Sequence, residues 1–397
     1  MNGLKSMHPL EKKVKKSIVD HGLLVAGDLV VAGTSGGPDS MALLHALKAL
    51  GATMNFGLLA VYVDHGLRPA ESRGEEQLVA AAAAELNIPW RSGRVAVADH
   101  ARQHGLSLEH AARELRYRFF AQVAEETGAA RIAVAHTADD QAEELLLRLL
   151  RGTTRGGLSG MAPLARECII RPLLAVSKAE VLDYLAQRGL AFAEDSSNHD
   201  RRFVRNRVRL DLVPWLEQRF NPRLRETLCH TATVLQDEEE LLAVMADQAY
   251  RQAVTAGQAL VARQNAAAGQ AMAASTTEQS VFGDPLCQVK AGLGSDGLGK
   301  AGTSQAAPAT LALSLAVFAA QPRALQRRLL EKSLLVMGLK PAGRQIEQLL
   351  HGAGRGGQGV IGHLAAGITV YKKAKILAFC REIPGQRRRP PPSAPKP

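Results

Sequence analysis

The first half of the chain alternates short apolar runs with longer segments in which apolar residues recur every three or four positions. The apolar runs predict buried strands at 25–34, 56–64 and 131–135. The longer segments predict helices at 40–50, 71–86, 107–127 and 138–151, the last ending at Gly152. Strands that alternate with helices favour an α/β fold, in which a mostly parallel sheet carries helices on both faces.

Polar residues follow each predicted strand at its carboxyl end. The first strand leads into residues 33–37, the second into 64–66 and the third into 136–140. Ligands of such sheets bind beyond the carboxyl ends of the strands. If the three strands are neighbours in the sheet, the three loops converge on one cleft.

The composition changes near residue 201, where five arginines fall within nine residues: Arg201, Arg202, Arg205, Arg207 and Arg209. Helical spacing follows at 224–256, whereas 261–308 is rich in Ala, Gly, Ser and Gln without clear periodicity. Such a composition predicts a linker or a disordered insertion. Beyond it, the pattern returns at 311–318, 323–339 and 345–351, and 367–379 is strand-like.

These changes predict five parts. They are an α/β domain at 1–215, a helical connector at 216–260, a low-complexity insertion at 261–308, a small α+β domain at 309–383 and a basic, Pro-rich disordered tail at 384–397.

Composition narrows the class of protein. Of 397 residues 46% are hydrophobic, which is enough for a sizeable core, and the net charge of +11 favours a polyanionic partner. The 4% of aromatic residues argues against a broad base-stacking platform. Neither a membrane span nor a signal peptide is recognisable, and the four cysteines form no CxxC pair. We therefore expect a cytoplasmic protein without a disulfide scaffold, zinc ribbon or membrane contact.

The sharpest chemical signal is the hexapeptide Ser35-Gly36-Gly37-Pro38-Asp39-Ser40, which follows a predicted strand and opens a helix. Glycines let backbone N–H groups approach a ligand, and a helix N-terminus favours phosphate. Asp39 offers a carboxylate to a hard cation such as Mg²⁺. A tight turn capped by Ser and Asp explains the same residues without a ligand. A second run, 294–301, nearly matches a Walker A loop, but Ala301 cannot ligate Mg²⁺ and no strand precedes it.

The hexapeptide resembles the SGGxDS loop of the PP-loop ATP pyrophosphatases, which cleave ATP to AMP and pyrophosphate. Blocks that are similar to the tRNA(Ile)-lysidine synthetases of this superfamily stand at 63–69, 113–117, 136–143, 149–156 and 194–207. The resemblance covers residues 25–215 and is weaker in the second domain, at 325–330 and 346–350. It implies the adenine nucleotide alpha hydrolase-like fold.

The resemblance also implies a reaction. In that family ATP adenylates the C2 carbonyl oxygen of the wobble cytidine in the CAU anticodon of tRNA(Ile), with release of pyrophosphate. Free L-lysine then displaces AMP and gives lysidine. The implied cofactors are therefore ATP and Mg²⁺, and the implied partners are tRNA(Ile) and lysine. Oligomeric state stays open, a homodimer included.

Carried over residue by residue, the resemblance assigns roles. ATP contacts the loop Ser35, Gly36, Gly37, Pro38, Asp39 and Ser40, with Asp64 and His65 beside the nucleotide and Asp39 on the metal. The lysine pocket comprises His136, Asp140 and Glu143. The catalytic residues are Asp39, Arg116, Asp140, Glu143 and Arg205. The tRNA contacts are Arg201, Arg202, Arg207, Arg209, Arg327 and Arg328.

Plainer roles remain open for several of these residues. Asp139 and Asp140 suit helix capping, Glu143 suits a first helical turn, and the arginines at 201–209 suit a solvated face. Two features depart from the family pattern. Glu144 stands where a threonine is expected, either perturbing the pocket or facing solvent, and the family does not predict the insertion at 261–308.

Three other functions compete. A PP-loop tRNA thiolase that uses cysteine or iron–sulfur chemistry needs paired or clustered thiols, which Cys168, Cys229, Cys287 and Cys380 do not offer in sequence. An amidating synthetase, such as those making NAD or GMP, does not explain the basic second half. A non-catalytic nucleotide- or RNA-binding module has no use for carboxylates around a phosphate loop.

Overall fold

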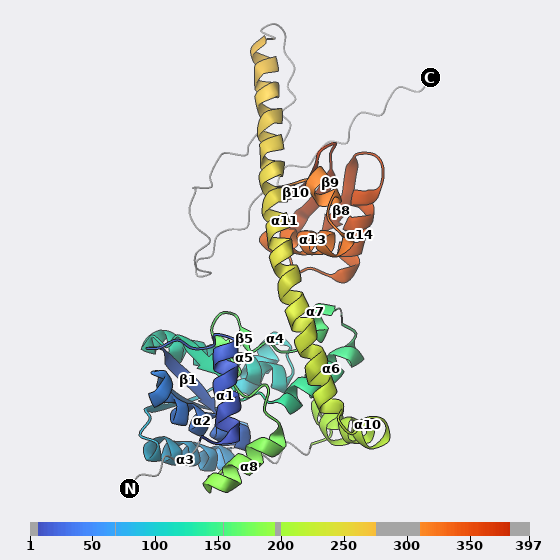
Figure 1. The fold of residues 1–397 in the computed structure, drawn as a ribbon. Helices are drawn as coiled ribbons and strands as arrows, with labels where there is room; N and C mark the ends of the chain where they lie inside the picture. Colours follow the sequence, from blue (N-terminus) through green and yellow to red (C-terminus); the bar gives the residue numbers. More distant parts are fainter. Residues whose placement is uncertain (1–6, 68, 154, 195–199, 275–309, 382–397) are drawn as a thin grey trace. The chain divides into compact units, whose positions relative to one another are not determined.

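A computed structural model describes residues 7–67, 69–153, 155–194, 200–274 and 310–381 (Figure 1). The chain forms two compact units, Met1–Glu239 and Glu240–Pro397. The boundary falls inside the predicted connector at 216–260, so that the two units share this segment.

The first unit is built on a six-stranded sheet with the order β3-β2-β1-β4-β6-β5. Its strands are β1 (Leu29–Thr34), β2 (Gly57–Asp64), β3 (Trp90–Arg94), β4 (Arg131–Ala133), β5 (Leu164–Ala165) and β6 (Ile169–Ile170). All neighbours pair in parallel except β5, which is antiparallel to β6. The predicted α/β fold with a mostly parallel sheet is confirmed.

Helices bury both faces of this sheet. Successive residues of a strand point to opposite faces, so Val30 packs with the cluster of α1, α2, α3 and α8, while Val31 packs against Phe120 of α5. The helices of the unit are α1 (Pro9–Asp20), α2 (Pro38–Met54), α3 (Pro69–Glu85), α4 (Val97–His104), α5 (Leu108–Thr127), α6 (Ala138–Arg151), α7 (Arg155–Leu158), α8 (Lys178–Arg188), α9 (Val204–Arg207) and α10 (Val213–Arg219).

The predicted strands at 25–34, 56–64 and 131–135 are β1, β2 and β4, each slightly shorter than expected. The pattern did not predict β3, whose five residues include the charged Arg91 and Arg94 and are mostly exposed at the edge of the sheet. An edge strand buries little side-chain area and therefore carries no clear hydrophobic signature.

The predicted helix at 224–256 is the first part of α11 (Leu224–Ala274), which continues into the segment expected to be a linker. Residues 261–274 are therefore helical, because their many alanines have the highest helix propensity. The rest of the predicted insertion, the Walker-like run at 294–301 and the predicted tail at 384–397 lie outside the described residues.

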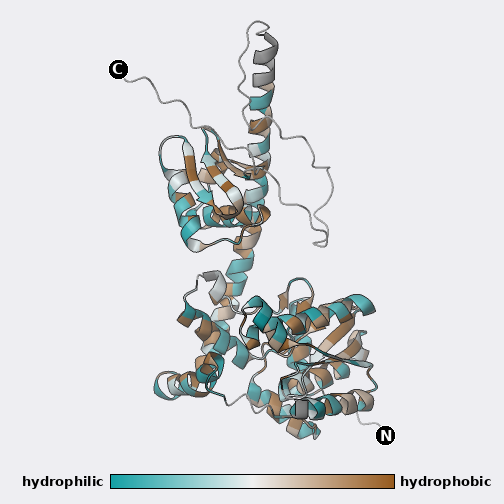
Figure 2. Cartoon of the chain, turned by 180° about the vertical axis from the view of Figure 1, so that it is seen from behind, coloured by the Kyte–Doolittle hydropathy of each residue, from teal (hydrophilic) through white to brown (hydrophobic). Residues whose placement is uncertain are grey.

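The second unit places helices on a four-stranded antiparallel sheet with the order β7-β10-β9-β8. Its elements are β7 (Thr310–Ser314), α12 (Leu315–Ala319), α13 (Arg323–Val336), α14 (Gly343–Gly354), β8 (Gly359–Leu364), β9 (Ile368–Lys372) and β10 (Ile376–Arg381). The strand-like run 367–379 is thus two strands of one hairpin. Figure 2 shows hydrophobic residues, in brown, along the strands of both sheets. Among the described helices, none is both long enough and apolar enough to span a membrane.

Candidate active site

The three polar loops lie together because their strands are neighbours. β1 pairs with β2 on one side and with β4 on the other. The carboxyl ends of parallel strands meet at one edge of a sheet. The loops that follow β1, β2 and β4 therefore converge there, as the sequence predicts.

The loop after β1 is organised by its own serines. Ser40 Oγ accepts a hydrogen bond from the backbone N–H of Ser35 at 3.1 Å and donates one to the Gly37 carbonyl at 2.9 Å. Gly36 adopts φ +77°, and a Cβ there would lie 3.3 Å from Glu75 Cβ. No side chain caps the N-terminus of α2, whose first residue is Pro38. The first turn of α2 therefore offers its backbone N–H groups to an anion.

A cavity of about 240 Å³ adjoins this loop. Four of the residues predicted for ATP binding and catalysis line it: Ser35, Gly37, His65 and Arg116. Arg116 lies 5.7 Å from the Tyr117 ring centroid and Arg113 lies 5.2 Å from it. Burial lowers the pKa of the Arg116 guanidinium, which stays charged at neutral pH. Asp64, at the end of β2, accepts from the Gly66 N–H at 2.8 Å and faces Arg94 Nε at 3.5 Å.

Asp39 is paired with a lysine that the sequence does not single out. Lys178 Nζ lies 2.7 Å from each carboxylate oxygen of Asp39, and the Lys178 backbone N–H donates to Asp139 Oδ2 at 2.7 Å. Burial raises the pKa of the Asp39 carboxyl above its usual range, and Lys178 opposes that shift. The Asp39 carboxylate pairs with an ammonium group and lies beside a phosphate-type loop. Proteins bind Mg²⁺ through one or two carboxylates and substrate phosphates, so this position fits a magnesium site.

Asp140 and Glu143 form a compact ion-pair cluster with Arg205 and Arg209. Glu143 Oε1 lies 2.6 Å from Arg209 Nε, and Glu143 Oε2 lies 3.2 Å from Arg205 Nε. Asp140 Oδ1 lies 3.0 Å from Arg205 Nη2 and 3.3 Å from Arg209 Nη2. The Glu143 side chain is only 4% exposed, so both carboxylates depend on the two guanidinium groups for their charge compensation.

Asp140 has a second, structural role. Its Oδ2 accepts from the Thr137 N–H at 2.9 Å and from Thr137 Oγ1 at 3.0 Å, which completes a capping box at the start of α6. Burial opposes ionisation of Asp140, but Arg205, the Thr137 N–H and Arg209 together hold the pKa of Asp140 below its usual range. The plainer interpretation of Asp140 as a helix cap and its place in a charged site are therefore both correct.

The two arginines of this cluster lie on two consecutive helical elements. Arg205 lies on α9 and Arg209 lies on the π turn η2 (Val208–Leu212), directly before α10. Pro214 lacks an N–H and cannot donate to the carbonyl four residues earlier, so the helical ladder is interrupted at this point. Arg205 and Arg209 stand four residues apart in this helical segment and lie on the same side, facing α6.

His136 contacts another residue that the motifs did not identify. Arg171, which is 7% exposed, donates from Nε to His136 Nδ1 at 3.1 Å and from Nη1 to the Ala162 carbonyl at 2.6 Å. Burial lowers the pKa of His136 to about 3, with help from the nearby arginines and against the effect of Asp140. His136 is therefore a neutral imidazole at physiological pH.

The remaining arginines of the 201–209 cluster are not the ones that pair with Asp140 and Glu143. Arg201 pairs with Asp211 at 3.1 Å, Arg202 pairs with Asp200 at 2.7 Å, and Arg207 is exposed. Arg209, grouped by sequence with the tRNA contacts, instead shares Glu143 with Arg205. Glu144, the departure from the family pattern, pairs with Arg148 at 2.7 Å rather than facing solvent freely.

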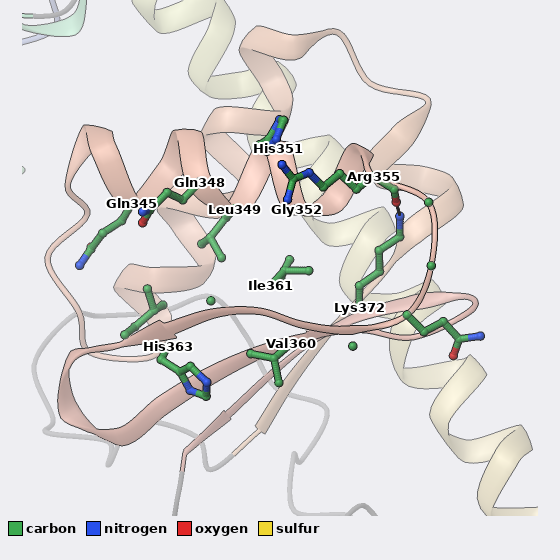
Figure 3. Close-up of a pocket in the computed structure, with 16 residues that line it drawn as sticks. Gln345, Gln348, Leu349, His351, Gly352, Arg355, Val360, Ile361, His363 and Lys372 are labelled. Carbon is green, nitrogen blue, oxygen red and sulfur yellow. Dashed lines mark hydrogen bonds between the residues drawn. The ribbon is translucent and has the colours of Figure 1, made fainter. Parts of the chain in front are cut away.

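The second unit carries a cavity of about 500 Å³ between α14 and β8 (Figure 3). None of its described lining residues is acidic, whereas His351, Arg355, His363 and Lys372 are basic. Lys372 Nζ donates to the Ala353 carbonyl at 2.8 Å and also contacts the Arg355 carbonyl. In Figure 3 the Arg355 side chain extends to just below His351. On α13, Arg327 pairs with Glu347 at 2.7 Å, and the neighbouring Arg328 is half-buried.

Lys178 and Arg171 show what the motifs missed. Both follow β6, and neither belongs to a recognisable spacing. The one available signal was position: like the predicted site residues, they come after a strand of the parallel sheet, but β6 has only two residues. So short a run gives no periodicity to read.

Comparison with known proteins agrees with this architecture. The family described as PP-loop domain matches residues 7–216. The tRNA(Ile)-lysidine synthase of Geobacter sulfurreducens is 42% identical over 255 residues, covering 63% of this chain and 54% of that protein. The tRNA(Ile)-lysidine synthase of Symbiobacterium thermophilum is 41% identical over 244 residues, covering 61% of this chain and 50% of that protein. This chain thus spans about half the length of the curated relatives it matches.

Among solved structures, the U34-tRNA thiolase NcsA from Methanococcus maripaludis matches with a TM-score of 0.49 and 18% identity, covering 57% of this chain and 78% of that one. The PP-loop match extends over more than half of the 397 residues and includes the phosphate-type loop, the Asp140–Glu143 cluster and the strands that bring them together. The chain therefore belongs to the PP-loop domain family.

Proposed function

We propose that this protein is an ATP-dependent ligase that joins free L-lysine to C2 of the wobble cytidine in the CAU anticodon of tRNA(Ile). The observation that carries the proposal is the placement of a phosphate-type loop and a buried two-carboxylate cluster at the same edge of one parallel sheet. A nucleotidyl transfer followed by attack of a cationic amino acid needs these two features together. The similarity to tRNA(Ile)-lysidine synthases supports the same reaction.

The first step joins the cytidine O2 to the α-phosphorus of ATP and breaks the bond to pyrophosphate. The loop at 35–40 and the N-terminus of α2 supply N–H donors for the phosphates. Arg116, in the adjoining cavity, supplies a fixed positive charge. Such preorganised charge is the dominant contribution in phosphoryl transfer. Asp39 would hold Mg²⁺, which neutralises phosphate charge when it is bound.

The second step joins the lysine amine to C2 and breaks the C2–O2 bond, so that AMP leaves with the oxygen. Asp140 and Glu143 are the carboxylates suited to a cationic substrate. Two guanidinium groups already occupy them, at 2.6–3.3 Å. Lysine recognition here therefore requires Arg205 or Arg209 to yield one of its contacts to the incoming ammonium.

The tRNA would contact basic surfaces on each unit. On the first unit, Arg201, Arg202 and Arg207 are exposed, in the same segment of the chain as Arg205 and Arg209. On the second, the cavity of Figure 3 has basic lining and no described acidic residue. Replacing one phosphate-contacting cation weakens binding to all sequences and lowers the salt slope by about 1. ATP, free lysine and tRNA are all cytoplasmic, which favours that compartment.

The thiolase alternative is less favoured. Cys168 and Cys229 are free thiols, and no group of three His, Cys, Asp or Glu residues in the described ranges could hold a metal ion.

The test is release of AMP and pyrophosphate from ATP, measured with a CAU-anticodon tRNA(Ile) transcript in the presence and absence of lysine. We expect turnover to need both, and mass spectrometry to find lysine on the cytidine. If pyrophosphate is released but lysine has no effect on its release, the adenylation step is supported and lysine is not the nucleophile. If AMP never forms, the protein is a binding module.

A further inference from the structure

His136 and Arg171 are brought together by the register of two parallel strands. β4 and β6 pair with Ile132 opposite Ile169 and Ala133 opposite Ile170, and the Val134 N–H donates to the Ile170 carbonyl at 3.0 Å. Arg171 directly follows β6, and His136 comes three residues after the end of β4, at the same carboxyl edge of the sheet. Their contact is thus set by the backbone of the central sheet and not by a mobile loop.

The hydrogen bond between them has a fixed direction. A guanidinium nitrogen donates and cannot accept, so Arg171 Nε–H must donate to His136 Nδ1 across 3.1 Å. Nδ1 is then the unprotonated nitrogen of a neutral ring, and the ring proton resides on Nε2. The second Arg171 bond, to the Ala162 carbonyl at 2.6 Å, holds the guanidinium in place. Within the described part of the chain, the hydrogen bond seen on the His136 ring is the one from Arg171.

We propose that Arg171 is a positioning residue that holds His136 as the Nε2–H tautomer, so that His136 donates a hydrogen bond to a carboxylate or phosphate oxygen of a bound substrate. This inference rests on the proposed function. On this assignment, a group other than His136 accepts the proton that the lysine amine loses, because His136 Nε2 already carries a proton. It also assigns the substrate ammonium to Asp140 and Glu143, since a donor N–H repels it.

The electrostatic surroundings agree with this assignment. Burial and the cations Arg171, Arg113 and Arg116 keep the imidazole neutral, although Asp140 favours its charged form. A neutral ring with one fixed donor is a hydrogen-bonding group of defined direction. Without Arg171, both nitrogens would be available, and the ring would sample two tautomers or accept a proton.

Nitrogen NMR of the histidine side chains tests the tautomer directly, in the full-length protein and without turnover. The His136 signal is identified by its loss in His136→Gln. We expect the Nε2–H pattern to persist from pH 5.5 to 8.5 in the wild type. In Arg171→Ala we expect mixed tautomers or a titration within that range. Arg171→Lys, which keeps a cation, should restore a neutral ring. An Nδ1–H or protonated ring in the wild type, or an unchanged signal in Arg171→Ala, would overturn the proposal.

Kinetics distinguish a donor from a base. Gln can place an amide N–H where His136 carries Nε2–H, so His136→Gln should lower kcat/KM by about tenfold, the scale of one hydrogen bond. His136→Phe should lose more than His136→Gln. If His136 were a general base, Gln and Phe would be equally poor, each about 10²–10⁴-fold down. Equal losses would therefore refute the donor role.

Two substrate arms identify the oxygen that accepts the bond. If it belongs to lysine, the difference between His136→Gln and His136→Phe disappears with cadaverine, which lacks the carboxylate. If it belongs to a phosphate, the difference already appears in the single-turnover burst of pyrophosphate that adenylation releases without lysine. A difference that persists with cadaverine but is absent from pyrophosphate release without lysine rejects the donor role. Absence of any turnover in the wild type would reject the proposed function instead, while the NMR result would still decide the tautomer.

Discussion

Replacing Glu143 by Gln tests the ion-pair cluster at its most buried member. The Glu143 side chain is 4% exposed and accepts from Arg209 at 2.6 and 3.0 Å and from Arg205 at 3.2 Å. Glu143→Gln leaves the two guanidinium groups with Asp140 at 3.0 and 3.3 Å, while Glu144 Oε2 lies farther away, 4.0 Å from Arg205 Nη1. Removing one partner of a buried pair costs about 3–5 kcal/mol. Because Arg205 and Arg209 are 24% and 34% exposed and keep some hydration, we expect about 3 kcal/mol.

For a domain of this size, each kcal/mol lowers Tm by about 2–4 °C. Glu143→Gln should therefore lower the Tm of the full chain by about 6–12 °C in differential scanning calorimetry. The matched control is Glu144→Gln, one residue along the same helix. Its carboxylate pairs with Arg148, is 22% exposed, and should cost about 1 kcal/mol or less. Equal shifts for the two variants would refute the inference that Glu143 compensates the arginines.

Three further predictions follow from single residues. Asp39→Asn should reduce pyrophosphate release about 100-fold and weaken its dependence on Mg²⁺, measured by titration with the metal. Gly36→Ala forces a side chain into φ +77° beside Glu75, and should destabilise the chain by about 1–2 kcal/mol in urea denaturation. The pKa of His136 is about 3 when folded and 6.5 when unfolded, so the unfolded chain binds the extra proton between these values and stability falls as pH falls below 6.5. Relative to His136→Gln, the wild type should lose about 2 kcal/mol between pH 7.5 and 5.0, measured by denaturation at both values.

The sequence predicted the parts of the fold whose signal is local. β1, β2 and β4 are buried on both faces and form apolar runs in the sequence, and α6 was predicted with its exact bounds from its helical spacing and from Gly152 at its end. The hexapeptide at 35–40 was found because glycine and serine turn chemistry depends on adjacent residues. Edge strand β3 and the two-residue strand β6 were not predicted, since neither carries a periodic pattern.

The sequence did not predict which residues pair with the residues of the site. Lys178 reaches Asp39 over 139 positions in the chain, and Arg209 reaches Glu143 over 66. Hydrophobic period and helix caps carry no information about such pairs, because ion pairing depends on distances that the packing of elements creates. The sequence also grouped Arg205 and Arg209 with neighbours that pair elsewhere, since only the packed structure shows which arginines face α6.

By itself, then, the sequence determined an α/β domain with a phosphate-type loop, and it marked Asp140 and Glu143 as carboxylates on one helix face. Only the tertiary structure decided that those carboxylates are compensated by Arg205 and Arg209, that Asp39 holds Lys178, and that Arg171 directs the proton of His136. The physical reason is that local patterns set which groups are present, whereas the register of parallel strands and the burial it creates set which groups meet and how they are charged.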